Sequence, residues 1–400
     1  MQRGKVEKGA QIQPRNVPRL PVLDWQAFGI RGASDVLSVS DGSEHIFTSS
    51  GRAAIMLGLE SLDVGKGDQV MVPTYHCPTM VAPIIAVGAE PVFYPINERG
   101  EAQLESVYAD TGTVKAVIVP HFFGIPQDMS HIRAFCDQRN IALIEDCAHC
   151  FFGLGGTRVV GHWGDIAIAS LTKFFPVPAG GILAFPQGAS RKPQLKSPGL
   201  VNEFKAVIDI LETAAGAGRL WGLGPLLRGI FSLKRSLRRN VSGGETSPHI
   251  SDVVAPEALG FDVVLAHRAP EWICRWMPSI TNRRRLAECR RENYRKLASV
   301  LSGHQGFAPL FPMLPSDAVP YVFPLRVDQP DGKYHKLKGL GLPVFRWNWL
   351  WPETPAIAGD SGLAWSSEVF QLACHQDLTE EELDCICSTV IRICSAPAAG

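Results

Sequence analysis

The chain has 400 residues, and at about 150 residues per domain this length predicts two or three domains. Hydrophobic residues make up 46% of it, which excludes a mainly disordered chain and allows a sizeable core. The 39 basic residues equal the 39 acidic ones, so the net charge provides no overall attraction to nucleic acid or to an anionic membrane.

The ten cysteines are spread along the whole chain, and its start lacks the apolar core of a secretory signal. We therefore expect a soluble, cytoplasmic protein whose thiols are reduced. The longest uncharged stretch, residues 70–89, is long enough to span a bilayer, but it contains three prolines and His76. Because these residues do not suit a membrane helix, we expect a strand, a turn and a buried helix there.

The first half alternates short β-rich runs with helical patterns, which is typical of βαβ units and a parallel sheet. The predicted strands are Gln69–Val72, Glu90–Tyr94, Ala116–Pro120, Ala142–Glu145, Ile166–Ser170 and Gly181–Phe185. The predicted helices between them are Gly51–Leu62, Thr79–Val87 and Met129–Arg139. Several of the strands are continuously apolar, as expected when helices cover both faces of the sheet.

The second half has a different pattern from about residue 187. We expect an N-terminal segment (1–40), the core of a large domain (41–186), a variable basic insertion with the remainder of that domain (187–275), and a smaller C-terminal domain (276–400). In the last unit the predicted helices are Asn282–Ser302 and Leu378–Ile393, and the predicted strands are Tyr321–Val327 and Leu342–Arg346. Thr379 followed by Glu382 predicts a capping box at the final helix.

Residues 213–244 form the basic insertion, which contains no acidic residue. Its basic residues are Arg219, Arg228, Lys234, Arg235, Arg238 and Arg239, and apolar residues alternate with them. One interpretation is a surface or lid that attracts an anionic ligand, or a membrane contact through residues 219–239. The alternative, which we favour, is a solvated insertion packed on the main domain.

Two segments next to predicted strands could bind a ligand, since ligands gather at strand ends in open α/β sheets. In the first, Ser50, Gly51 and Arg52 open a helix, and small residues at a helix start favour phosphate binding. The same residues also suit an ordinary helix cap. In the second, Tyr75 or His76 could stack on a planar cofactor or belong to the core.

An acid and a lysine follow two further predicted strands. Asp146 could hold a protonated ring nitrogen with His149 beside that ring, or it could cap the next turn while His149 bonds a backbone carbonyl. Lys173 lies among apolar residues after Ser170. Desolvation lowers the pKa of such a lysine and makes its neutral amine nucleophilic, whereas the competing interpretation is a surface lysine.

Together, a phosphate-type helix start, an acid after a strand and a downstream lysine describe a pyridoxal-phosphate (PLP) site. The order and spacing of these blocks resemble the DegT/DnrJ/EryC1/StrS family, the fold-type-I aminotransferases that act on nucleotide-linked keto-sugars. The resemblance covers most of residues 40–185, through SSGRAA, GKGDQVMVPTYHCPTMVAPIIAVGAEPVFYPI, PHFFGIPQDM, IEDCAHCFFG and GHWGDIAIASLTKFFPVPAGGILAF. It resumes faintly in the arginine-rich helix with Tyr294 and at CHQDLTEEEL.

The resemblance implies an α/β fold of type I, with a mostly parallel sheet in the large domain, a smaller C-terminal α/β domain and the cofactor at their junction. It implies that Lys173 binds PLP covalently and that Asp146 pairs with the pyridine nitrogen. Further residues implied at the cofactor are Ser50, Gly51 and Arg52 at the helix start, His149 beside the ring, and Ser170 at the phosphate. Glutamate as amino donor and a homodimer with shared sites are also implied.

The sequence departs from the family pattern at several positions. The lysine loop LTKFFPVPAGG is short and rich in proline, and Arg52 stands where the family usually has Thr. Where the family usually has a ring-stacking aromatic residue, a strict count gives Cys77, with Tyr75 and His76 beside it. The asparagine that a neighbouring subunit often supplies has no obvious match in residues 245–275.

Two alternatives to a sugar aminotransferase stay open from the sequence. One is a relative that acts on a non-sugar ketone, because the acceptor cannot be read from these residues; a dehydratase is disfavoured, since that branch generally lacks the lysine. The other is a non-catalytic sensor or assembly protein with this fold. We expect no metal site, because Cys147 and Cys150 lack a second pair at zinc-ribbon spacing and are interpreted as buried thiols.

Overall fold

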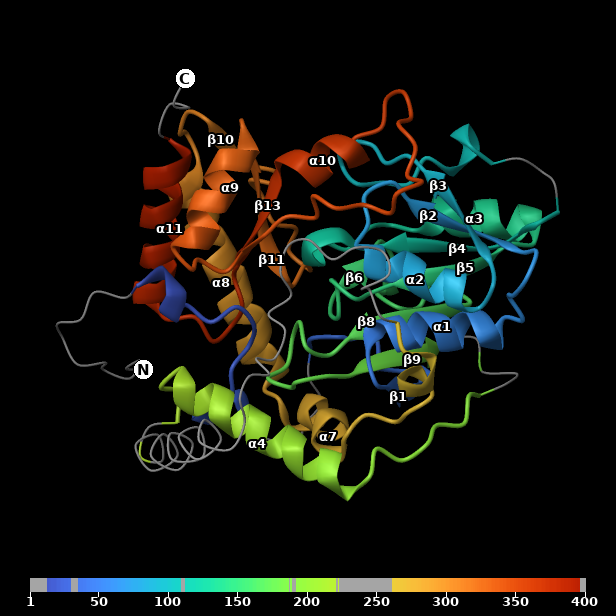
Figure 1. Cartoon of the computed structure of the whole chain (residues 1–400), viewed down its shortest axis with the longest axis horizontal. Coiled ribbons are helices and arrows are strands. Elements are labelled where there is room, and N and C mark those ends of the chain that lie inside the picture. Colours follow the sequence, from blue (N-terminus) through green and yellow to red (C-terminus); the bar gives the residue numbers. More distant parts are fainter. Residues whose placement is uncertain are drawn as a thin grey trace, which may run out of the picture.

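The computed structural model describes residues 13–29, 35–108, 112–186, 188, 192–220, 222 and 261–395. A seven-stranded sheet and a four-stranded sheet form its frame, and a two-stranded ribbon accompanies them (Figure 1). Of the basic insertion, Arg228, Lys234, Arg235, Arg238 and Arg239 lie outside the described residues, so the favoured solvated insertion and the alternative membrane contact through 219–239 both stay predictions.

The large sheet has the strand order β1-β9-β8-β5-β4-β2-β3. Its strands are β1 (Glu44–Thr48), β2 (Gln69–Pro73), β3 (Glu90–Tyr94), β4 (Val114–Pro120), β5 (Ala142–Asp146), β8 (Ile166–Ser170) and β9 (Gly181–Phe185). Strand β9 runs antiparallel to β1 and β8, and the pairs from β8 to β3 are parallel. The predicted mostly parallel sheet is therefore confirmed. Strand β1 and the ribbon β6 (Leu154–Gly155) and β7 (Arg158–Val159) were not predicted.

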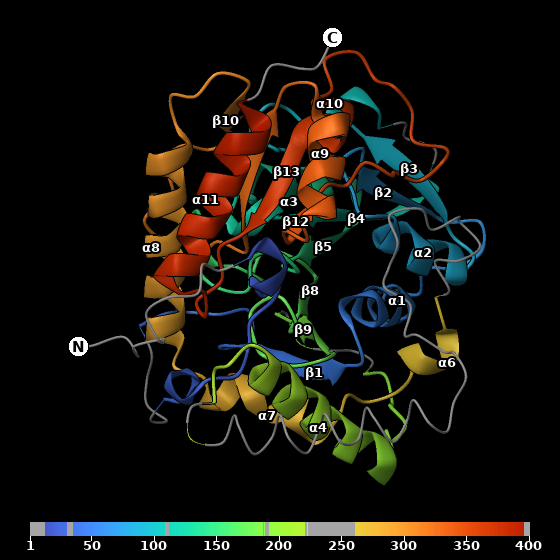
Figure 2. The same cartoon turned by 60° about the vertical axis from the view of Figure 1, so that its left-hand side comes forward.

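Helices cover both faces of this sheet (Figures 1 and 2). Helices α1 (Gly51–Ser61) and α2 (Pro78–Ala86) pack on one face, and α3 (Ser130–Arg139) packs on the other. Successive strand residues point to opposite faces, so Ile144 packs with α1 and α2 whereas Leu143 packs with α3. The same alternation sends the next two side chains of β5, Glu145 and Asp146, to opposite faces.

The uncharged stretch 70–89 forms strand β2, a turn and helix α2, as the prolines predict. Helix α2 begins at Pro78, where a missing N–H group is harmless, and it contains Pro83. Within the described ranges, no helix is both long and apolar enough to cross a membrane.

The smaller sheet is antiparallel, with the order β10-β11-β13-β12. Its strands are β10 (Phe307–Pro309), β11 (Val322–Val327), β12 (Val344–Phe345) and β13 (Val369–Ala373); the accompanying helices are α8 (Arg283–Leu301), α9 (Pro330–Gly339), α10 (Gly362–Glu368) and α11 (Glu380–Cys394). Strand β13 was missed because it lies directly after α10 with no turn residue between them. The predicted capping box is present, since the Thr379 and Glu382 side chains each accept a backbone N–H of the other.

The remaining elements lie around these two sheets. Helices α4 (Leu200–Gly216) and α7 (Trp272–Ile280) lie together beyond the β1 edge, and α6 (Val263–Ala266) packs against α1 (Figure 2). The short 3-10 helices are η1 (Pro14–Asn16), η2 (Trp25–Ala27), η3 (Leu104–Ser106) and η4 (Phe122–Gly124). Arg219 after α4 forms an ion pair of 2.5 Å with Glu382, so the first basic residue of the insertion packs against the smaller sheet's unit. The boundaries proposed for the domains remain a prediction.

Candidate active site

A cavity of about 300 Å³ lies at the carboxyl ends of β4, β5 and β8. Asp146 and Ser170, the last residues of β5 and β8, line it together with the start of α1. Tyr321 and Gln371, from the smaller sheet's unit, close it from the opposite side. The cavity therefore lies where ligands bind in parallel α/β sheets, between the two sheets.

Lys173 and Asp146 face the same cavity and influence each other electrostatically. Burial lowers the pKa of Lys173 to about 8, although the charge of Asp146 opposes this effect. Burial also raises the pKa of Asp146, and the charge of Lys173 opposes that rise. The backbone N–H of Ala148 donates to Asp146 Oδ1 at 2.8 Å, which orients the carboxylate. The site thus places an amine and a carboxyl group, both with shifted pKa values, in one cavity at the end of the sheet.

His149 lies in the wall of this cavity as a flat, neutral ring. Burial and the nearby charge of Lys173 hold its pKa well below the usual value of 6.5. Its ring centroid lies 4.7 Å from that of Tyr321 and 5.0 Å from that of Trp347. The ring therefore presents an apolar, aromatic surface next to the lysine.

The start of α1 forms a second wall of the cavity, lined by Ser50, Gly51 and Arg52. The Ser50 hydroxyl caps the helix by accepting the N–H of Ala53 at 3.1 Å. The N-terminal N–H groups of a helix attract anions. Ser170 lies against this end, because a Cβ on Gly51 would be 3.6 Å from the Ser170 Cβ. These four residues are brought together as one polar corner, which we name the anion-binding corner because its N–H and hydroxyl groups suit an anion.

Tyr75 and His76 do not line the cavity, whereas Cys77 does. The Tyr75 hydroxyl accepts from Gln371 Nε2 at 3.2 Å, and its ring packs on Phe122 and Trp347. His76 Nδ1 lies 2.9 Å from the Pro73 carbonyl oxygen, and burial lowers its pKa to about 4. The structure therefore places both rings in the core, and the strict count that gave Cys77 matches the cavity wall.

The backbone around Lys173 is held by two side chains that sequence reasoning missed. Arg290 of α8 is fully buried, and its guanidinium donates to the Lys173 carbonyl at 2.8 Å and to the Pro320 carbonyl at 2.8 Å. Gln376 accepts from Arg290 Nε at 2.7 Å and donates to the Phe174 carbonyl at 3.1 Å. The sequence could have pointed to both residues. Arg290 is a charged residue on the apolar face of α8, and Gln376 belongs to the CHQD motif.

The cavity also contains residues from regions with little or no recognised resemblance. These are Arg19 of the N-terminal segment and Tyr321, Phe345, Trp347 and Gln371 of the smaller sheet's unit. Tyr321 is close to the chemistry, since Lys173 Nζ lies 5.3 Å from its ring centroid. No local pattern marks these residues, because they approach the lysine only through the packing of the two units.

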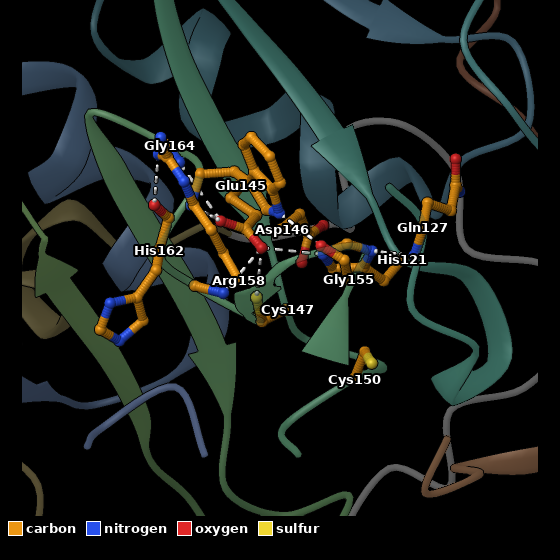
Figure 3. Close-up of polar contacts among 12 residues, drawn as sticks. His121, Gln127, Glu145, Asp146, Cys147, Cys150, Gly155, Arg158, His162 and Gly164 are labelled. Carbon is orange, nitrogen blue, oxygen red and sulfur yellow. Dashed lines mark hydrogen bonds and ion pairs between the residues drawn. The ribbon is translucent and has the colours of Figure 1, made fainter. Parts of the chain in front are cut away.

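Glu145 points to the other face of the sheet and forms a separate buried network (Figure 3). His121 Nε2 donates to its Oε1 at 2.9 Å, while His121 Nδ1 accepts the N–H of Gln127. Burial alone would raise the pKa of Glu145, but hydrogen bonds from His121 and from backbone N–H groups outweigh it and lower that pKa. The carboxylate therefore stays ionised and fixes β5 beside Asp146.

The loop before β8 is held by the same carboxylate. Glu145 accepts the backbone N–H of Gly161 at 2.6 Å, of Trp163 at 2.7 Å and of Gly164 at 3.2 Å.

His121, Glu145 and Cys147 form a cluster of side chains of the kinds that bind metals, and their potential ligand atoms all lie within 4.8 Å of one another. The His121 and Glu145 atoms of this cluster are already engaged in hydrogen bonds. Cys147 and Cys150 are buried thiols whose pKa values burial raises.

Residues 40–207 match the DegT/DnrJ/EryC1/StrS aminotransferase family, so the resemblance found in the sequence is confirmed. Among curated proteins, the chain is 35% identical over 147 residues to a UDP-N-acetyl-3-dehydro-alpha-D-glucosamine 3-aminotransferase of Acidithiobacillus ferrooxidans. It is 30% identical over 189 residues to a dTDP-4-dehydro-2,3,6-trideoxy-D-glucose 4-aminotransferase of Saccharopolyspora spinosa. The matches cover 36% and 46% of this chain and only 38% and 48% of those relatives.

Solved structures resemble the chain over most of its length. The aminotransferase TlmJ of Streptoalloteichus hindustanus has a TM-score of 0.56 at 20% identity, over 86% of this chain and 84% of its own. NtdA of Bacillus subtilis, solved with bound PMP, has a TM-score of 0.54 at 18% identity, over 88% of this chain and 74% of its own. At these identities the likeness shows the fold, which is that of the PLP-dependent aminotransferases of fold type I.

Proposed function

Since residues 40–207 match the DegT/DnrJ/EryC1/StrS aminotransferase family, we propose that this protein is a PLP-dependent aminotransferase acting on a nucleotide-linked keto-sugar. The observation that carries the proposal is the cavity that unites the Lys173 amine, the Asp146 carboxylate and the anion-binding corner at α1. A role in making a surface polysaccharide or a glycosylated metabolite agrees with the sugar-nucleotide names of the relatives.

The donor set of the cavity fits PLP. Ser50, Gly51, Arg52 and Ser170 would hold the phosphate with hydroxyls, backbone N–H groups and one positive charge. Asp146 would hold a proton on the pyridine nitrogen, and His149 would lie against the ring. Tyr75 and His76 are not part of this proposed set, since both lie outside the cavity wall.

When bound, PLP supplies an electron sink for the charge that develops beside the transferred nitrogen. The chain's own side chains would transfer the proton and position the reacting groups. The Lys173 amine, with its pKa near 8, is matched to accepting and returning a proton near neutral pH. Arg290 and Gln376 hold the backbone of the lysine loop, so the amine stays within reach of the substrate carbon.

We also propose that the working form is a homodimer in the cytoplasm, with glutamate as the amino donor. Exposed apolar side chains on α4 and α6 support the dimer, since Phe204 is 69% and Val264 is 72% exposed. The ten free thiols support a reducing compartment. Light scattering of the purified protein would test the dimer directly.

The visible absorption spectrum of the purified protein, loaded with PLP, tests the proposed function. We expect a band that is absent from Lys173→Ala and is bleached when glutamate is added. The Lys192→Ala variant is a matched control because Lys192 forms an exposed ion pair with Glu44 and does not line the cavity. A wild-type protein that takes up no PLP would overturn the enzyme proposal in favour of a non-catalytic relative.

A further inference from the structure

The N-terminal segment forms a strap (residues 13–24) that packs on the smaller sheet's unit, outside the family match. Helix η1 packs on α11, and Val17 is buried in the core of the smaller sheet's unit (Figure 1). The Pro18 carbonyl lies 3.0 Å from His375 Nε2, and the Val22 N–H donates to Asp377 Oδ2 at 3.2 Å. The backbone is therefore anchored on both sides of Arg19.

Arg19 is the residue of the strap that reaches the cavity. Its guanidinium carbon lies 3.7 Å from the centroid of the Phe345 ring, a stacked cation–π contact. Its charge, together with that of Arg290, opposes the burial that raises the pKa of Tyr321 to about 12. Lys173 Nζ lies 5.3 Å from the centroid of the same Tyr321 ring, and Arg19, Tyr321 and Lys173 line the same cavity.

The charges around the cavity favour an anionic occupant. Among the described residues that line it, Arg19, Arg52 and Lys173 are basic, and Asp146 is the acidic one. Arg52 belongs to the corner proposed for the cofactor phosphate, and Asp146 faces Lys173. Arg19 stacks on Phe345, a residue of the smaller sheet's unit that also lines the cavity.

We propose that Arg19 and Phe345 form a subsite for an anionic oxygen group of the substrate, and this inference rests on the proposed function. Stacking on Phe345 uses the face of the guanidinium, while its N–H donors lie in its plane and suit a two-pronged bond to a carboxylate or phosphate. The shared chemistry has two possible sources, the carboxylate of the amino donor and the diphosphate of the sugar nucleotide. Each source is tested by a separate probe.

Calorimetric titration of the PLP-treated protein with glutarate and, separately, with UDP distinguishes these sources. We expect Arg19→Gln to weaken the binding of at least one probe by about tenfold or more, and Arg19→Lys to weaken that binding less. Loss of glutarate binding assigns the subsite to the donor carboxylate, and loss of UDP binding assigns it to the diphosphate. Arg15→Gln is the matched control, because Arg15 lies on the same strap and does not line the cavity.

The inference is overturned if both probes bind Arg19→Gln within about twofold of wild type, or if neither binds the wild-type protein. Phe345→Leu provides a second variant that keeps the charge and removes the stacked surface; it should weaken the same probe as Arg19→Gln. A protein without the Lys173-dependent band would reject the proposed function, and the probe titrations would still decide the role of Arg19 separately.

Discussion

Lys173 and Asp146 each depart from their ordinary titration because they share one desolvated cavity. Burial favours the neutral form of both groups, and their mutual attraction favours the charged forms. The balance leaves the lysine with a pKa of about 8, which keeps a usable fraction of neutral amine at neutral pH. The pKa of Lys173 therefore depends on the burial of this side chain and on the charge of Asp146, and a substitution of Asp146 tests that dependence.

The rate at which the cofactor-free protein captures PLP should follow the neutral form of Lys173. We expect this rate to rise with pH and to level off above about pH 8, instead of rising toward the 10.5 of an ordinary lysine. In Asp146→Asn the midpoint should move to lower pH, because the lost negative charge had been raising the lysine pKa. Stopped-flow absorbance measures both profiles, and an upward shift in the variant would contradict the electrostatic coupling.

At the scale of elements, the anion-binding corner depends on how closely β9 approaches the start of α1. A Cβ on Gly181 would lie 2.6 Å from the Ser50 carbonyl oxygen and 2.8 Å from the Gly51 nitrogen. These are backbone atoms that cannot rotate away. Only a glycine at the start of β9 allows the helix N-terminus to sit at this edge of the sheet.

Gly181→Ala should therefore cost about 1–3 kcal/mol of unfolding free energy and weaken PLP binding, because α1 must shift. Gly332→Ala is the control, since no heavy atom outside its immediate neighbours lies within 4 Å of a Cβ there. Urea denaturation and PLP titration provide the two measurements. Equal stability and PLP affinity in the two variants would refute the role given to this contact.

Strand β5 carries two acids with opposite environments, and Glu145 should contribute to stability as a buried, ionised group. Its folded pKa is depressed below 4.5, so its contribution is present above that value and is lost as the pH falls through the folded pKa. We expect Glu145→Gln to lose about 3 kcal/mol or more at neutral pH and to show a shallower loss of stability in acid. Glu98→Gln, at an exposed position, is the control. Denaturation curves at several pH values provide the measurement. If Glu145→Gln lost stability with falling pH as steeply as the wild type, this assignment would be wrong.

At the scale of the whole molecule, the lysine loop is the point where the two sheets are joined. Arg290 is a buried cation whose pKa burial lowers to about 10, and carbonyls from both units accept its N–H groups. Its side chain also stacks 4.6 Å from the Phe174 ring centroid. One side chain of α8 therefore fixes both the packing of the units and the backbone of Lys173.

Replacing this residue should affect folding and cofactor binding together. Arg290→Met leaves buried carbonyls of Lys173 and Pro320 without their donors, and we expect a loss of about 3 kcal/mol with weaker PLP retention. Arg284→Met removes an exposed arginine of the same helix, paired with Glu288, and should leave stability nearly unchanged because solvent screens this ion pair. Guanidinium denaturation measures the stability of both variants, and PLP content after gel filtration measures their cofactor retention. Full PLP retention by Arg290→Met would count against the positioning role of Arg290.

The sequence by itself determined six strands of the large sheet and the helices between them, the mostly parallel sheet and the residues at its strand ends. These depend on periodicity, caps and apolar runs, which are local properties of the chain. Asp146, Ser170 and Lys173 could be selected in this way because each lies at or just after the end of a strand, and parallel strands carry their ends to one edge. The capping box at Thr379 could be predicted for the same reason, because it joins residues only three positions apart.

Only the tertiary structure decided which side chains face the cavity and which support it. Tyr75, His76 and Cys77 are consecutive, and the packing of Tyr75 against Gln371 and of His76 against the Trp351 backbone leaves Cys77 at the wall. Arg19 reaches the cavity, and Arg290 reaches the Lys173 carbonyl, from distant parts of the chain. Their placement arises from the docking of two units and a strap, and no short window of sequence encodes contacts at that separation.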